Sequence, residues 1–121
     1  QESQKDLISE AFGILDGVKQ NDTQWSIVYD ITERQIHFRT KRLQEIKTLR
    51  LKDFDFNADS KICDINTREL DFGNFSIQAN NQLLKNVFGK FTEAGEMSNE
   101  QASSFLSRLI DYSVNCNSID K

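Results

Sequence analysis

Apolar and polar side chains alternate in two short segments of this chain, residues 24–30 and 35–40, and this pattern predicts two β-strands. A four-residue loop, Ile31 to Arg34, would join them as a hairpin. One face carries Trp25, Ile27, Tyr29, Ile36 and Phe38, and the other carries Ser26, Val28, Asp30, His37 and Arg39. A slip of one residue would mix these faces, so the pattern also predicts the register. The expected pairs are Trp25 with Thr40, Ser26 with Arg39, Ile27 with Phe38, Val28 with His37 and Tyr29 with Ile36.

The segments that follow extend this hairpin. Residues 45–51 are predicted to form a third strand and to complete an antiparallel meander over residues 24–51. Further along the chain, residues 62–65 are predicted to form a short strand, and Gly73-Asn74 is predicted to form a turn.

Apolar residues also recur at steps of three and four, which predicts amphipathic helices. The predicted helices cover residues 3–18, 76–88 and 98–113. Ser3 and Ser98 are the expected N-caps, followed three residues on by Asp6 and Gln101, and Gly89 is expected to end the second helix. The expected fold class is α+β: an N-terminal helix, a three-stranded antiparallel meander and two C-terminal helices packed on it.

The length of 121 residues suits a single domain, 1–121. Within it, residues 1–56 hold the first helix and the sheet, and residues 57–121 hold a loop and a helical extension. The net charge of −4 argues against a nucleic-acid partner. The basic stretch from Arg39 to Lys52 is interpreted as a solvated surface, because acidic Glu45 lies within it.

The sequence predicts no contact with a membrane. No apolar run approaches the roughly 20 residues of a membrane span, and no signal-peptide pattern follows Gln1. Gln1 is not an initiator methionine, which leaves open that the chain is a processed or truncated piece. The two cysteines leave a periplasmic, a secreted and a cytoplasmic location open.

The only histidine, His37, is the main candidate for catalysis, because Ser26 and Asp30 lie near it in the predicted register. A flat strand surface rarely forms a concave site, however, so a surface or packing role is predicted. Cys63 has no adjacent basic residue to activate its thiol, and Cys116 lies in an Asn-rich tail, so neither is a predicted nucleophile. One histidine and two distant cysteines also make a poor zinc site.

Acidic residues at alternate positions have the spacing of a calcium-binding loop. The ligands would be Asp53, Asp55, Asn57, Asp59, Ser60 and Asp64. Ala58 replaces the glycine of such loops, and Phe54 and Phe56 interrupt the polar pattern. We therefore expect an acidic connector whose two phenylalanines are buried. From the residues alone, no catalytic, cofactor-binding or metal-binding residue is assigned, and no cofactor is expected.

The first helix and the hairpin resemble the C-terminal part of choloylglycine hydrolases and penicillin V acylases. The resemblance covers about residues 5–52, in the motifs AFGILDGV, TQWSIVYD and QIHFRT. The matching residues are Ala11, Phe12, Ile14, Leu15, Thr23, Trp25, Ser26, Val28, Tyr29, Asp30, Phe38, Arg39 and Thr40.

This resemblance implies part of the four-layer αββα sandwich of bacterial N-terminal-nucleophile hydrolases. Such enzymes cleave a linear amide C–N bond, as in conjugated bile salts or penicillin V. Their nucleophile is a cysteine at the mature N-terminus, whose own α-amino group acts as the base. This chain has Gln1 at that end, and the other catalytic positions of the family precede the matched segment, so no catalytic residue carries over.

Two hypotheses follow. In the first, the chain is the C-terminal structural region of an amide hydrolase and is inactive alone, and its partner is the remainder of that chain or another subunit. In the second, it is a non-catalytic binding or protein-interaction domain, which could form an oligomer.

Overall fold

The predicted hairpin is present and has the predicted register. The structure is a computed structural model that describes residues 3–117. In it, β1 (Trp25–Asp30) pairs antiparallel with β2 (Gln35–Thr40). The pairs are Trp25 with Thr40, Ser26 with Arg39, Ile27 with Phe38, Val28 with His37 and Tyr29 with Ile36. The alternation of side chains was therefore sufficient to specify this pairing.

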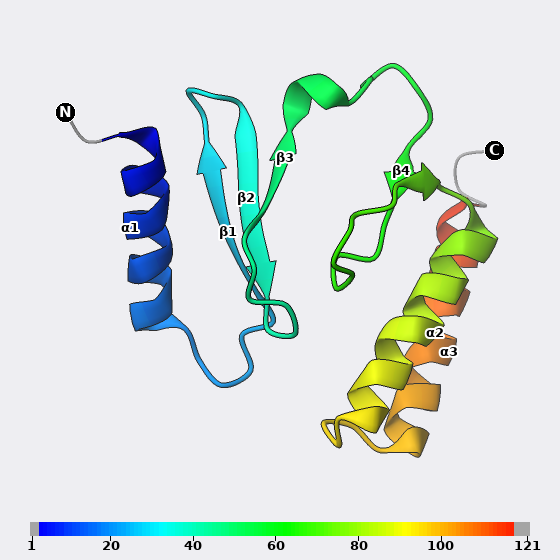
Figure 1. Ribbon diagram of the computed structural model, residues 1–121. Helices are drawn as coiled ribbons and strands as arrows, with labels where there is room; N and C mark the ends of the chain where they lie inside the picture. The colour runs from blue at the N-terminus through cyan, green and yellow to red at the C-terminus, as the bar shows by residue number, and fades with distance from the viewer. Residues whose placement is uncertain (1–2, 118–121) are drawn as a thin grey trace. The chain divides into compact units, whose positions relative to one another are not determined.

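The third strand, β3 (Lys47–Arg50), pairs antiparallel with β2 and completes the meander (Figure 1). It is shorter than the predicted residues 45–51. The chain leaves the sheet at Leu51, where the short 3₁₀ helix η1 (Leu51–Asp53) begins. The order β1-β2-β3 leaves β1 and β3 as edge strands among the described residues.

The loop between β1 and β2 holds an unusual backbone conformation. Arg34 has a φ of 53° and is the only described non-glycine residue with a positive φ. This left-handed region costs an L-residue with a side chain roughly 1–2 kcal/mol. The backbone carbonyl of Arg34 accepts a hydrogen bond of 3.1 Å from the N–H of Leu51, which ties the start of η1 to this loop.

Helix α1 (Gln4–Val18) begins with the cap that the sequence predicts. The Oγ atom of Ser3 accepts a hydrogen bond from the N–H of Asp6, and a carboxylate oxygen of Asp6 accepts one of 3.2 Å from the N–H of Ser3. This reciprocal pair satisfies backbone donors that the first turn would otherwise leave unbonded.

Helix α1 packs on the face of the hairpin that the sequence marks as more polar. Phe12 is buried there, and the guanidinium carbon of Arg39 lies 5.0 Å from the centroid of its ring. The amide of Gln4 donates a hydrogen bond of 2.7 Å to Asp30 on the same face. The aromatic side chains of Trp25 and Tyr29, on the other face, are 58% and 66% exposed.

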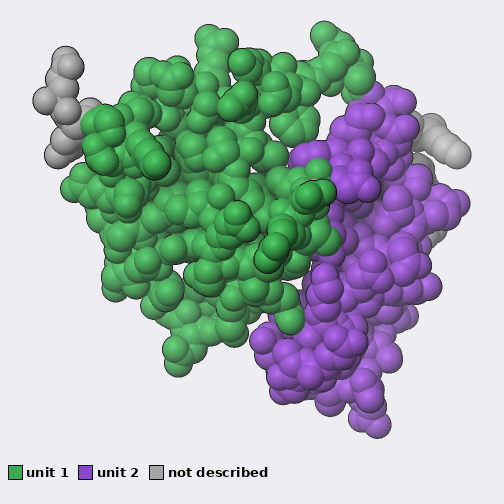
Figure 2. Space-filling model, in the orientation of Figure 1, with its two compact units in different colours: residues 1–58, 65–70 green, residues 59–64, 71–121 purple. Residues whose placement is uncertain are grey.

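The chain forms two compact units (Figure 2). The first contains the chain up to residue 58 and residues 65–70, and the second contains residues 59–64 and the chain from residue 71 onward. Residues 65–70 belong to the first unit because Lys47 of β3 donates hydrogen bonds to the carbonyls of Ile65 and Thr67. The expected packing of the C-terminal helices on the meander stays a prediction.

The second unit contains a small ladder that the sequence did not predict. The two-residue strands β4 (Lys61–Ile62) and β5 (Gly73–Asn74) pair antiparallel, and the N–H of Phe75 donates a bond of 2.8 Å to the carbonyl of Ser60. The predicted turn at Gly73-Asn74 is therefore wrong, and the predicted strand over residues 62–65 coincides with β4 only at Ile62. Both errors have one cause: the pairing joins segments about a dozen residues apart, which no local pattern reveals.

Two helices complete this unit: α2 (Ile77–Glu93) and α3 (Asn99–Asn117), which pack on each other. The capping box predicted for α3 is confirmed. The N–H of Ser98 donates a hydrogen bond of 3.0 Å to the side-chain oxygen of Gln101. The backbone N–H of Gln101 in turn donates one of 3.1 Å to the Oγ atom of Ser98. Helix α3 continues past the predicted residue 113.

The prediction that Gly89 ends the second helix is wrong. Helix α2 continues through Gly89 to Glu93; Ala94 is its C-cap, and Gly95 follows with a φ of 70°. There the N–H of Glu96 bonds to the carbonyl of Phe91 at 3.0 Å, and the N–H of Gly95 bonds to that of Thr92 at 3.1 Å. This pair of bonds is a Schellman motif, which needs a left-handed residue at the position of Gly95.

The two glycines of α2 give a matched pair of variants. Gly89→Ala should stabilise the protein by about 0.5–1 kcal/mol, because alanine is the better helix former and its methyl group would meet nothing within 4 Å. Gly95→Ala should destabilise it by about 1 kcal/mol, because alanine disfavours a positive φ. Urea unfolding followed by circular dichroism measures both changes. Equal effects of the two substitutions would contradict the assigned helix end.

Candidate functional site

His37, the candidate base, is a buried side chain of β2. Its Nδ1 atom lies 2.9 Å from the Oγ1 atom of Thr48 on β3. Its Nε2 atom has less than 1 Å² of accessible surface and bonds to no described residue. With one ring nitrogen bonded and the other covered, the imidazole has no free position from which to exchange a proton with a substrate.

Asp30, the second candidate residue, is buried at the end of β1, where it is 6% exposed. One carboxylate oxygen accepts a hydrogen bond of 2.9 Å from the N–H of Glu33, and the other accepts the bond from Gln4. These bonds, the one from Glu33 first, hold the pKa of Asp30 below its usual 3.8. The carboxylate thus joins the β1–β2 loop and α1 to the strand.

Both residues line a cleft of about 560 Å³ between the N-terminal half of α1 and the sheet. Ser26, the third residue that the sequence placed near them, does not line it; Ser26 lines two other clefts, beside Trp25 and Thr23. The structure therefore brings together His37 and Asp30 but not the candidate nucleophile. Ser9 of α1 does line the cleft, but neither nitrogen of His37 is available to activate its hydroxyl group.

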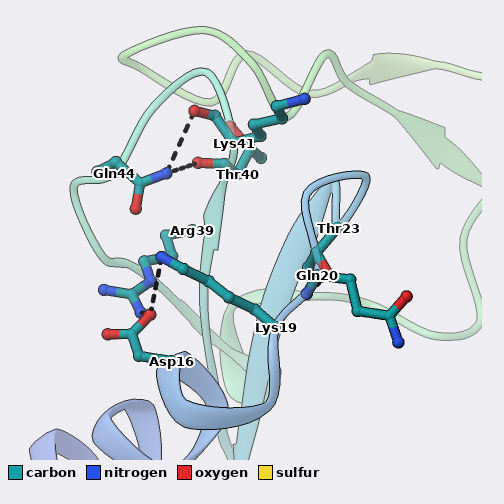
Figure 3. A network of polar contacts seen from close by, with 8 residues as sticks. All are labelled: Asp16, Lys19, Gln20, Thr23, Arg39, Thr40, Lys41 and Gln44. Carbon is teal, nitrogen blue, oxygen red and sulfur yellow. Dashed lines mark hydrogen bonds and ion pairs between the residues drawn. The ribbon is translucent and has the colours of Figure 1, made fainter.

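A second polar network, which the sequence did not reveal, connects the C-terminal half of α1 to β2 (Figure 3). Asp16 forms ion pairs with Arg39 and with Lys19, the second at 3.3 Å. The hydrogen bond from Arg39, and after it that from Lys19, lowers the pKa of Asp16. Asp16 follows Phe12 by one helical turn, so the same helix face supplies both the acidic and the aromatic contact of Arg39.

The loop between β2 and β3 lies beside this network and has hydrogen bonds of its own. The side-chain amide of Gln44 donates hydrogen bonds of 2.9 and 3.2 Å to the carbonyls of Thr40 and Lys41 (Figure 3). The Oγ1 atom of Thr40 accepts one of 3.0 Å from the N–H of Leu43. Together with Asp16 and Arg39, this loop lines a cleft of about 240 Å³. The bonds are internal to the protein, and they order the β2–β3 connection.

The acidic stretch does not gather into a cation site. Asp55 accepts a bond of 2.9 Å from the N–H of Asn57, and Asp64 pairs with Lys90 of α2 at 3.1 Å. In the part of the chain that the structure describes, no three His, Cys, Asp or Glu side chains are placed to hold a metal ion. The predicted burial of Phe56 is wrong, since its side chain is 76% exposed.

Cys63 does not contribute to these clefts. Cys63 is half-buried in the second unit and lines none of the clefts named here. The side chain of Cys116 lies outside the described residues.

An apolar surface follows α1 and the open edge of β1. We call it the α1–β1 surface; it comprises Leu15, Val18, Trp25, Ile27 and Tyr29. Val18 is 70% exposed, although it lies on the apolar side of its helix. By contrast, only three apolar side chains of the described residues are buried: Phe12, Phe38 and Ala102. Apolar side chains gathered on a surface mark sites that another surface covers.

Comparisons with protein-family models, with curated proteins and with solved structures found no match to this chain. Among the described residues, no helix combines the length and the apolar character that a membrane span requires. The geometry of the first unit therefore carries the functional argument.

The lowered pKa of Asp30 predicts how stability depends on pH. Its ionised form stabilises the fold above pH 3.8, and this contribution is lost as the pH falls through the lower folded-state value. Asp30→Asn should therefore destabilise the protein at pH 7 and have a smaller effect in acid. Urea unfolding between pH 7 and pH 3 checks this. Asp22→Asn, on the exposed loop after α1, is the control, and an Asp30→Asn effect that does not change with pH would contradict the prediction.

Proposed function

We propose that this chain is the C-terminal structural region of a linear-amide C–N hydrolase of the choloylglycine hydrolase type. The exposed α1–β1 surface carries the proposal. Among the described residues, three apolar side chains are buried while Val18, Trp25 and Tyr29 are exposed, and such a surface is suited to pack against more protein. The proposed partner is the remainder of the hydrolase chain or another subunit.

The layer order of the first unit supports this proposal. In an αββα sandwich, each sheet has a helical layer on one face and the second sheet on the other. Here α1 lies on one face of the meander, and the aromatic side chains of Trp25 and Tyr29 extend from the other. The edge strand β1 also has an open side, where a larger sheet could continue.

The proposed role is structural, because neither Asp30 nor His37 offers a free group to a substrate. The carboxylate of Asp30 bonds to backbone and amide donors, and the Nε2 atom of His37 is covered. Amide cleavage would need a nucleophile and a base from elsewhere. In the family that the chain resembles, a cysteine at the mature N-terminus supplies both, through its thiol and its α-amino group.

The first test is the intact mass and N-terminal sequence of the protein isolated from its natural source. The proposal expects a chain or complex several times larger than these 121 residues, with a cysteine at one mature N-terminus. That protein should hydrolyse a conjugated bile salt or penicillin V, and the isolated 121-residue chain should hydrolyse neither. A natural chain of this length, folded as a monomer or dimer, would favour the alternative of a non-catalytic interaction domain.

The α1–β1 surface gives a matched pair of tyrosine variants. In the whole hydrolase, Tyr29→Ser should destabilise the protein by about 3 kcal/mol, because it would remove a buried aromatic side chain. In the isolated chain, where Tyr29 is 66% exposed, the same change should cost less than about 0.5 kcal/mol. The control is Tyr112→Ser on α3, at 69% exposure and outside the resembling segment.

Thermal and urea unfolding of both forms measure these differences. The proposal predicts a large loss for Tyr29→Ser in the whole hydrolase only. An equally small effect of Tyr29→Ser in both forms would show that the α1–β1 surface stays uncovered, and would contradict the proposal.

A further inference from the structure

Another cleft of the first unit, of about 630 Å³, lies between the β1–β2 loop and η1. We call it the loop–η1 cleft. Its main lining residues are Arg34, Arg50, Leu51, Lys52, Phe54 and Phe56. The bond from the N–H of Leu51 to the carbonyl of Arg34 connects its two sides. The volume falls within the range of sites for small organic molecules.

The cations of this cleft form no ion pair among the described residues. No ion pair among the described residues involves Arg34, Arg50 or Lys52, and the only acidic side chain in the lining is Glu33. The cleft beside Asp16 differs, because Asp16 pairs with both Arg39 and Lys19 there. In a chain with a net charge of −4, three unpaired cations around one cleft form a local anion-attracting field.

The cleft also has an apolar part. Leu51 and Phe54 are half-buried, and Phe56 holds an aromatic ring that is 76% exposed. Exposed aromatic side chains beside unpaired cations suit a ligand with an apolar body and a negative head group.

The backbone at Arg34 supports the same conclusion. Its φ of 53° is a conformation in which glycine is more stable than arginine. Non-glycine residues with left-handed backbone angles cluster at functional sites, where the strained backbone orients a side chain. Here the strained residue contributes one of the three cations of the cleft.

We infer that the loop–η1 cleft binds a small amphiphilic carboxylate, which is a compound with one carboxylate group and an aliphatic or aromatic body. Arg34, Arg50 and Lys52 contact the carboxylate, and Leu51, Phe54 and Phe56 contact the apolar body. This site is separate from the α1–β1 surface, and it does not depend on the proposed hydrolase function.

Octanoate is the probe, and heteronuclear NMR of the ¹⁵N-labelled chain is the measurement. Octanoate should bind saturably and shift the amide signals of Arg34, Leu51 and Phe54. Octanol shares the apolar body and acetate shares the carboxylate, and each should bind at least about tenfold more weakly, since charge and apolar contact both contribute. Equal binding of octanol or of acetate would overturn the inference.

Three variants separate binding from folding. Arg50→Gln should weaken octanoate binding about tenfold, whereas Arg108→Gln on α3 should leave it unchanged. Arg34→Gly should weaken binding while it raises the unfolding temperature, because it relieves the positive φ. Loss of binding only in variants that also unfold at lower temperature would overturn the assignment.

A membrane surface presents similar chemistry and needs its own arm of the experiment. Vesicles of phosphatidylglycerol should bind the chain no more tightly through this cleft than vesicles of phosphatidylcholine. One result would overturn the small-ligand inference in favour of a membrane contact. In it, the chain cosediments with the anionic vesicles, Arg50→Gln abolishes this cosedimentation, and octanoate shifts no amide signal.

Discussion

The contact of Arg39 with helix α1 decides how the first unit is arranged. The guanidinium group pairs with Asp16 and lies over the ring of Phe12, and its side chain is only 16% exposed. A charge so nearly buried needs a partner, since an unpaired one would be strongly destabilising. Asp16 supplies it, and α1 must therefore lie on the face of the hairpin that carries Arg39.

This arrangement explains why the more apolar face of the hairpin is not the one that the helix covers. The helix is also joined to that face through Gln4 and Asp30, near its other end. With both ends of α1 bonded to the polar face, Trp25 and Tyr29 remain on a surface. The exposed α1–β1 surface is thus a consequence of ion pairing and hydrogen bonding, and it is the feature on which the proposed structural role rests.

Three clefts of the first unit, beside Asp30, beside Asp16 and between the β1–β2 loop and η1, differ in where their charges find partners. Asp30 and Asp16 are bonded within the protein, and both have lowered pKa values for that reason. Their clefts are therefore parts of the scaffold. In the loop–η1 cleft, Arg34, Arg50 and Lys52 have no ion pair within the described chain, so their charges are available to a ligand. Paired charges hold α1 on the sheet, and the unpaired ones mark the candidate binding site.

Features that depend on near neighbours could be predicted from the order of residues alone. The alternation over residues 24–40 specified the hairpin and its register, and the Ser3 and Ser98 caps specified where two helices begin. Contacts between distant residues were decided only by the tertiary structure. The pairing of Asp16 with Arg39, the β4–β5 ladder and the choice of Gly95 over Gly89 as the helix end each depend on such contacts or on backbone geometry. A periodic pattern predicts which side chains share a face of a strand. It does not predict which face a helix covers, because here that depends on the ion pair between Asp16 and Arg39, which are 23 residues apart in the sequence.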